Sequence, residues 1–171
     1  MKNARIALAA LWVVLFLLGC GGRAHRTLYE KEGGFSYDPP PGWRITNFPG
    51  LKYKIAAGTP ENGFAPNINI VDETYSGSLS DYVELNIQNL KRVLPTSQVL
   101  KREDFQTNDA LASIRLITER HDANIGKDLR QTFYFFENGS HKFVVTCSAL
   151  ADGGDDLDTL FEQSMKTFHL P

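Results

Sequence analysis

The fold of this 171-residue chain is decided by the stretch Leu129-Arg-Gln-Thr-Phe-Tyr-Phe-Phe-Glu-Asn-Gly-Ser-His-Lys-Phe-Val-Val-Thr-Cys-Ser-Ala149. Asn138 and Gly139 tolerate the positive φ of a tight turn, so the runs on either side of them are predicted to form an antiparallel hairpin. Both runs are apolar at consecutive positions, which predicts that side chains on both faces of the sheet are covered.

Shorter patterns extend the prediction outward from this hairpin. Ser78 and Asp81 form a capping pair that starts a helix, and Pro95 ends it. A second helix is predicted for residues 156–168, where apolar residues recur at helical spacing. The remaining predicted strands cover residues 35–37, 43–45, 51–57, 67–74, 98–105 and 110–119. Together these patterns predict an α+β domain in which two helices and a sheet covered on both sides form an α/β sandwich.

The N-terminus has the features of an export signal. Lys2 and Arg5 precede a thirteen-residue apolar run, Ile6 to Leu18. A helix needs roughly twenty apolar residues to span a bilayer, so the run is too short for a membrane span and is typical of a signal peptide.

The end of this run, Leu17-Leu18-Gly19-Cys20, resembles the lipobox of bacterial lipoproteins. The resemblance implies cleavage between Gly19 and Cys20 and several acyl chains, such as palmitate, on Cys20. Two or more chains are enough for stable anchoring. The alternatives are an ordinary signal peptide that contains a cysteine and an uncleaved anchor. Gly21, by resemblance to bacterial sorting rules, implies the periplasmic face of the outer membrane if the cell has two membranes.

Three segments follow from these features: a signal peptide over 1–19, a flexible tether over 20–33 with lipidated Cys20, and one domain over 34–171. Removing Lys2 and Arg5 leaves 16 basic and 20 acidic residues, a net charge of −4. An acidic domain is not expected to bind nucleic acid, and the lipid alone is expected to hold it at the membrane.

Acylation of Cys20 leaves Cys147 without a disulfide partner, and the strand pattern around Cys147 predicts a buried, unreactive thiol.

A family resemblance supports the fold prediction. The stretch Phe35-Ser-Tyr-Asp-Pro-Pro-Pro-Gly-Trp43 is similar to the opening of PsbP-like domains. The close of those domains is similar to Lys142-Phe-Val-Val-Thr-Cys-Ser-Ala149 followed by a helix that ends in Ser164-Met-Lys-Thr-Phe168. The resemblance implies a central, mainly antiparallel sheet flanked by helices on both faces, an α/β/α sandwich. This fold is shared by photosystem PsbP proteins, the Ran-binding Mog family and DcrB-like envelope lipoproteins. It carries over no functional residues.

The candidates for a chemical site have simple structural explanations. Four carboxylates, which could bind calcium, cluster at Asp152, Asp155, Asp156 and Asp158. The cluster lacks the calcium-loop signature, and acidic residues also stabilise the start of a helix. The four histidines are scattered without zinc-ligand spacing. No catalytic motif is visible, although Arg115, His121 and Asp122 could form a site in three dimensions.

Aromatic residues in or beside predicted loops supply another candidate. They form either a binding edge or a set of caps on the core: Trp43, Phe48, Phe64 and Tyr75. The sequence therefore predicts a non-enzymatic envelope lipoprotein, without a cofactor, that presents its domain to a protein or envelope partner. A small-molecule or metal binder is the alternative, and an enzyme with a spatially assembled site is the third possibility.

Overall fold

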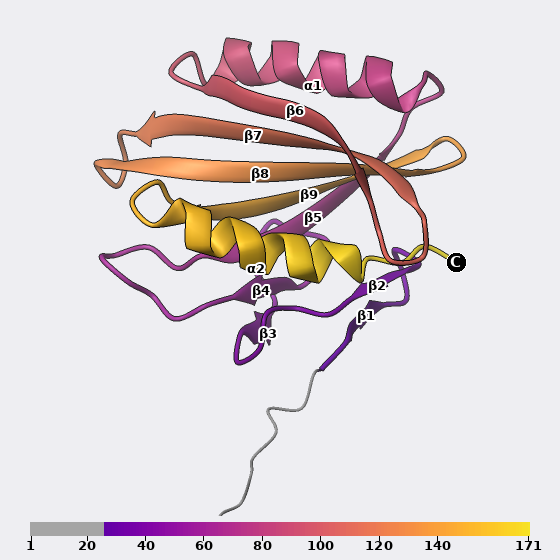
Figure 1. The fold of residues 1–171 in the computed structure, drawn as a ribbon, viewed down its shortest axis with the longest axis horizontal. Helices are drawn as coiled ribbons and strands as arrows, with labels where there is room; N and C mark the ends of the chain where they lie inside the picture. The colour runs from indigo at the N-terminus through magenta and orange to yellow at the C-terminus, as the bar shows by residue number, and fades with distance from the viewer. Residues whose placement is uncertain (1–25) are drawn as a thin grey trace, which may run out of the picture.

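The computed structural model describes residues 26–171, except for the side-chain environments of residues 154 and 155 (Figure 1). The expected signal peptide and Cys20 lie outside the described residues. The elements are, in chain order, β1 (Leu28–Glu30), β2 (Phe35–Tyr37), β3 (Arg44–Thr46), β4 (Ile55–Ala57), β5 (Asn67–Thr74), α1 (Leu79–Val93), β6 (Gln98–Gln106), β7 (Ala112–Asp122), β8 (Lys127–Asn138), β9 (His141–Leu150) and α2 (Gly154–Lys166).

Seven strands form one sheet in the order β3-β4-β5-β9-β8-β7-β6, and every pairing between neighbours is antiparallel. The predicted hairpin is confirmed. Its register places Asn138 opposite His141, and Gly139 takes the positive φ of +60° that its turn requires. The strands β1 and β2 pair with each other as a small separate sheet.

Side chains that alternate along β8 enter two different hydrophobic clusters, because successive residues of a strand point to opposite faces. Tyr134 and Phe136 pack in a cluster with Phe161 and Met165 of α2. Phe135 packs in the other cluster with residues of α1. An antiparallel sheet with two helices is thus confirmed. The contacts of α1 are mainly with β7 and β8, and those of α2 with β8 and β9 (Figure 1).

Local signals set the limits of α1 as predicted. The Ser78 hydroxyl accepts a hydrogen bond from the Asp81 backbone N–H (3.1 Å) and donates one to the Asp81 carboxylate (2.7 Å). The helix ends at Val93, before Pro95. Neither α1 nor α2, among the residues described, is long and apolar enough to cross a membrane.

The expected flexible tether over 20–33 is wrong for its C-terminal part. Leu28–Glu30 forms β1, which pairs with β2. Leu28 is buried in the core and Glu30 lies 3.2 Å from the Lys54 ammonium. The sequence pattern misses this strand because three residues are too few to show alternation, and pairing with β2 and the burial of Leu28 in the core fix them.

Candidate functional site

The first half of α1 is packed firmly onto the sheet. Tyr82 and Val83 are buried, and the Tyr82 ring meets Phe135 edge-on with 6.2 Å between centroids. The Tyr82 hydroxyl donates a hydrogen bond to the Glu73 carboxylate. Burial, followed by this carboxylate, raises the pKa of Tyr82, so the phenol stays protonated and keeps donating.

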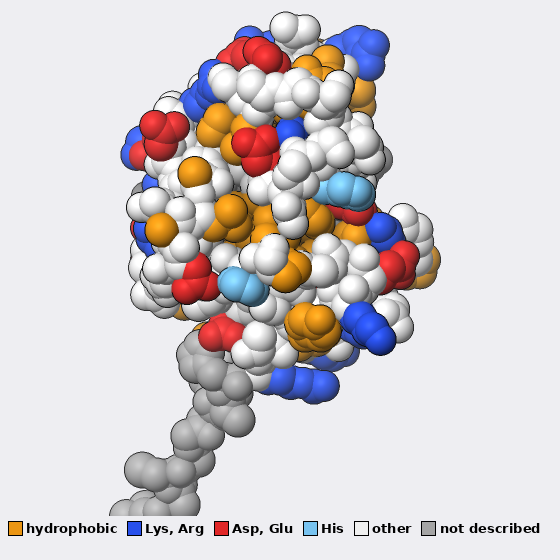
Figure 2. Space-filling view, turned by 90° about the vertical axis from the view of Figure 1, so that its right-hand side faces the viewer, with side chains coloured by type: hydrophobic (Ala, Val, Ile, Leu, Met, Phe, Trp, Pro, Cys, Tyr) orange, Lys and Arg blue, Asp and Glu red, His pale blue; other side chains and the backbone are white. Residues whose placement is uncertain are grey.

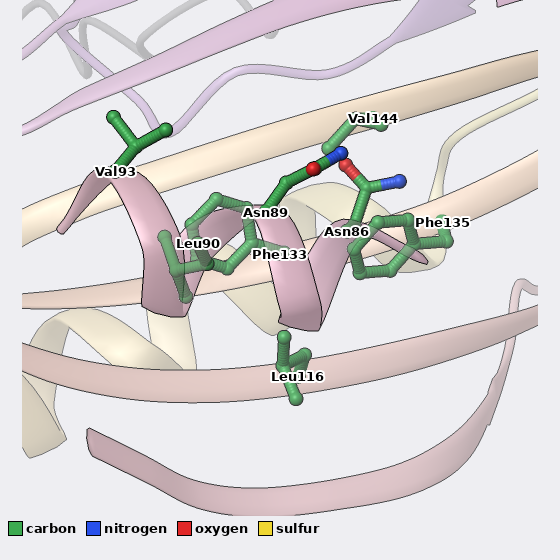
Figure 3. A pocket seen from close by; sticks show the side chains of 8 residues that line it. All are labelled: Asn86, Asn89, Leu90, Val93, Leu116, Phe133, Phe135 and Val144. Carbon is green, nitrogen blue, oxygen red and sulfur yellow. The ribbon is translucent and has the colours of Figure 1, made fainter. Parts of the chain in front are cut away.

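The second half of α1 leaves a groove above the sheet, which we call the α1 groove (Figure 3). Its volume is about 220 Å³. Four side chains of the helix form one wall and four from β7, β8 and β9 form the floor: Asn86, Asn89, Leu90, Val93, Leu116, Phe133, Phe135 and Val144.

The polar groups of the α1 groove are neutral amides. The Asn86 side chain donates to the Tyr82 carbonyl one helical turn earlier (2.9 Å), and the Asn89 oxygen accepts from Arg92 (3.1 Å). None of the described residues that line the groove is ionisable. The geometry therefore suits an apolar group that is accompanied by neutral hydrogen-bonding atoms.

The surface around the groove is partly apolar and partly polar. Val71 lies opposite Val144 in the sheet register and is 43% exposed, and Val93 is 68% exposed. On the other side, Thr146 lies opposite Phe133, so the two side chains share a face of the sheet. Exposed valines beside a recess are a common feature of docking surfaces.

Sequence reasoning missed the α1 groove, although one signal for it was present. Asn86 and Asn89 are three residues apart and therefore share a helix face with Val93. Asparagine is a poor helix former, so two of them on one face suggest a role other than helix stability. The floor was not visible, because it joins residues from three strands.

The structure does not bring the four predicted edge aromatics together. Trp43 packs edge-on against Phe161, with 5.9 Å between ring centroids, and belongs to the α2 cluster. Tyr75 packs on Tyr82 in the α1 cluster. Phe48 is 55% exposed at a turn, and Phe64 lines a different hollow. Trp43 and Tyr75 are therefore caps on two separate clusters.

The acidic cluster does not form a metal centre in the part of the chain that the structure describes. Asp152 and Asp156 line one hollow together with Phe64. Asp158 instead accepts hydrogen bonds from Arg130 (2.8 Å) and Thr132 (3.1 Å). The side chain of Asp155 is not among those described. Pairing with Arg130 removes Asp158 from any shared ligand set.

The three residues considered for an enzyme site are directed to different partners. Arg115 pairs with Glu103 and with Glu162 of α2. Asp122 pairs with Arg120 (2.8 Å), and His121 lies 2.7 Å from Asp128.

Cys147 is buried on β9, as predicted. Burial, followed by the charge of Asp158, raises the pKa of its thiol. The reactive thiolate is thereby disfavoured at neutral pH.

Comparisons with known proteins define the class of fold. No family model matches the sequence, and no curated protein matches it. Solved structures do match: the chain has the PsbP-like fold.

Three of these structures show the range of that fold. The cyanobacterial PsbP protein, CyanoP, of Synechocystis sp. PCC 6803 superposes with a TM-score of 0.64 at 14% identity, covering 90% of this chain and 96% of that one. LpqN, involved in cell envelope biogenesis of Mycobacterium tuberculosis, superposes with a TM-score of 0.61 at 15% identity, covering 85% of this chain and 90% of that one. The Ran-binding protein Mog1p of Saccharomyces cerevisiae superposes with a TM-score of 0.60 at 12% identity, covering 85% of this chain and 94% of that one.

Proposed function

We propose that this chain is an envelope lipoprotein, anchored through acylated Cys20, whose PsbP-like domain binds another protein in the α1 groove without catalysing a reaction. The observation that carries the proposal is the groove itself, with its apolar floor, its amide wall and its exposed rim at Val71 and Val93. The lipobox at Leu17 to Cys20 supports the anchor. An envelope protein and a Ran-binding protein among the structural neighbours support a protein partner.

The size of the groove favours a protein side chain over a free ligand. Pockets for drug-sized molecules usually hold at least about 300 Å³. The α1 groove holds about 220 Å³ and is open along one side. That volume accepts one large apolar side chain of a partner, which is the usual anchor at the centre of a protein interface. The amides of Asn86 and Asn89 are placed to meet the backbone beside such an anchor.

A photo-crosslinking amino acid at position 93 tests the partner directly in living cells. Val93 is exposed at the rim of the groove, whereas Leu85 is exposed on the same helix and is absent from the groove lining. We expect one protein to be captured from position 93 and not from the matched control at position 85. Capture should be lost in Asn89→Leu, because two methyl groups then replace the amide that lines the wall of the groove. Equal capture from both positions would contradict the proposal.

A small apolar molecule is the second candidate, and the aromatic floor at Phe133 and Phe135 favours it. Native mass spectrometry of the purified protein separates the two candidates. The small-molecule candidate is supported if a neutral molecule copurifies with the wild-type chain but not with Asn89→Leu, and if position 93 gives no crosslink. That result would contradict a protein partner in the groove.

A further inference from the structure

One end of the domain is built from two segments that contact each other. The Lys54 ammonium lies 3.2 Å from Glu30 of β1, and the Lys52 ammonium lies 4.0 Å from Glu32. The connection between β3 and β4 therefore lies against β1. In Figure 1 these strands are at the end of the molecule where the described chain begins, and α1 is at the opposite end.

This end exposes two aromatic side chains. Tyr29 is 67% exposed, because its neighbours Leu28 and Glu30 point inward and the strand alternates. Phe48 is 55% exposed at the start of a turn in which the Leu51 N–H bonds to the Phe48 carbonyl (3.1 Å). Exposed aromatic rings of this kind favour the interface between a bilayer and water.

The segment 26–54 differs in the sign of its charge from the rest of the domain, and one of its lysines, Lys52, is paired with Asp72 of β5 (3.1 Å). Residues 26–54 contain five basic and three acidic residues, a net charge of +2. Residues 55–171 contain ten basic and seventeen acidic residues, a net charge of −7. Figure 2 shows hydrophobic and basic side chains, together with some acidic ones, at the lower end of the face it presents, next to the start of the described chain. Basic residues beside a membrane are attracted to anionic lipids.

We infer that the surface formed by Tyr29, Phe48 and the basic residues of 26–54 rests on the headgroups of an anionic bilayer. The inference rests on the proposed anchor at Cys20. Five residues lie between Cys20 and Arg26, so an extended chain reaches at most about 20 Å from the acylated residue to the domain. The anchor thus keeps this end, rather than α1, close to the lipid.

Two consequences follow for the whole molecule. The lipid does not act alone, as the overall charge of −4 had indicated, because the charge is distributed unevenly along the chain. With the β1 and β3 end against the membrane, α1, which forms one wall of the groove, lies at the end far from the bilayer (Figure 1). A partner then reaches the groove without crossing the headgroup layer.

Spin labels on the full-length, acylated protein in vesicles test this orientation. Tyr29→Cys and Phe48→Cys place a label on the proposed contact surface, and Val93→Cys is the matched control at the other end. Acylated Cys20 and buried Cys147 leave the introduced thiol as the one that reacts. The vesicles contain phosphatidylcholine with or without phosphatidylglycerol, and collisions of each label with oxygen and with a water-soluble nickel chelate are measured.

With anionic lipid, we expect labels at 29 and 48 to collide more with oxygen and less with nickel than the label at 93. Lys31→Glu combined with Arg44→Glu changes the charge of residues 26–54 from +2 to −2. In this double variant both labels should collide less with oxygen and more with nickel. Labels at 29 and 48 that are as accessible to nickel as the label at 93, on protein whose acylation is shown by mass spectrometry, would overturn the orientation alone. A mass spectrum without acyl chains would refute the anchor and the orientation together.

Discussion

Asn89 in the wall of the α1 groove offers a test that couples stability to binding. Replacing it by leucine removes a poor helix former from the interior of α1, which stabilises the helix by roughly 0.4 kcal/mol. Leucine has as many side-chain heavy atoms as asparagine, so the second gain arises because two methyl groups replace the amide oxygen and nitrogen beside the apolar floor at Phe133. Burying two apolar carbons at about 0.8 kcal/mol each, halved because the groove is open along one side, adds about 0.8 kcal/mol to the free energy of unfolding.

Asn89→Leu is therefore expected to raise the free energy of unfolding by about 1 kcal/mol. For a domain of this size the melting temperature should rise by roughly 2–4 °C in a thermal scan followed by circular dichroism. Asn89→Gln is the matched control, because it keeps an amide and recovers only the helix-propensity part. The hydrogen bond from Arg92 is exposed, and its loss should cost little.

The outcome that refutes the reasoning is a loss of stability in Asn89→Leu relative to Asn89→Gln. It would mean that the leucine finds no apolar floor to cover, and hence that the groove does not exist as described. A stabilised variant that still captures the partner from position 93 would show that the groove exists but is not the binding site.

Three further predictions concern the anchor, an ion pair and the core. Cys20→Ala should abolish incorporation of radiolabelled lipid and leave a precursor that keeps its signal peptide; a variant that still matures and carries lipid would contradict the anchor. Lys101, and then Arg115, hold the pKa of Glu103 below its ordinary value. The ionised carboxylate therefore stabilises the fold at neutral pH, and this contribution is lost as the pH falls through the folded-state pKa of Glu103. Glu103→Gln should accordingly lower the melting temperature at neutral pH but not in acid, and a difference that stays constant with pH would argue against the ion pair. Phe168 is fully buried and stacks on Phe136 with 4.2 Å between ring centroids. Phe168→Ala should therefore lower the free energy of unfolding, measured in urea, by about 3–5 kcal/mol. A decrease of less than about 1 kcal/mol would show that this contact is not formed.

The sequence by itself determined those features that depend on neighbours along the chain. Asn138 and Gly139 predict the hairpin because only certain residues accept a positive φ, and Ser78 predicts the start of α1 because its hydroxyl reaches the amide three residues on. The burial of Cys147 followed from alternation along a single strand. In each case the interaction that decides the structure is between residues close in the chain, so the residue types are enough to predict it.

Only the tertiary structure decided which distant residues meet. Glu30 of β1 pairs with Lys54 from the connection between β3 and β4, and Asp158 leaves the acidic cluster because Arg130 comes from another element. The α1 groove joins a helix face to three strands, and the surface that we propose faces the membrane joins β1 to the turn after β3. Packing between elements creates both surfaces. The pattern of residues along the chain does not predict how far one half of a helix lies from the sheet beneath it.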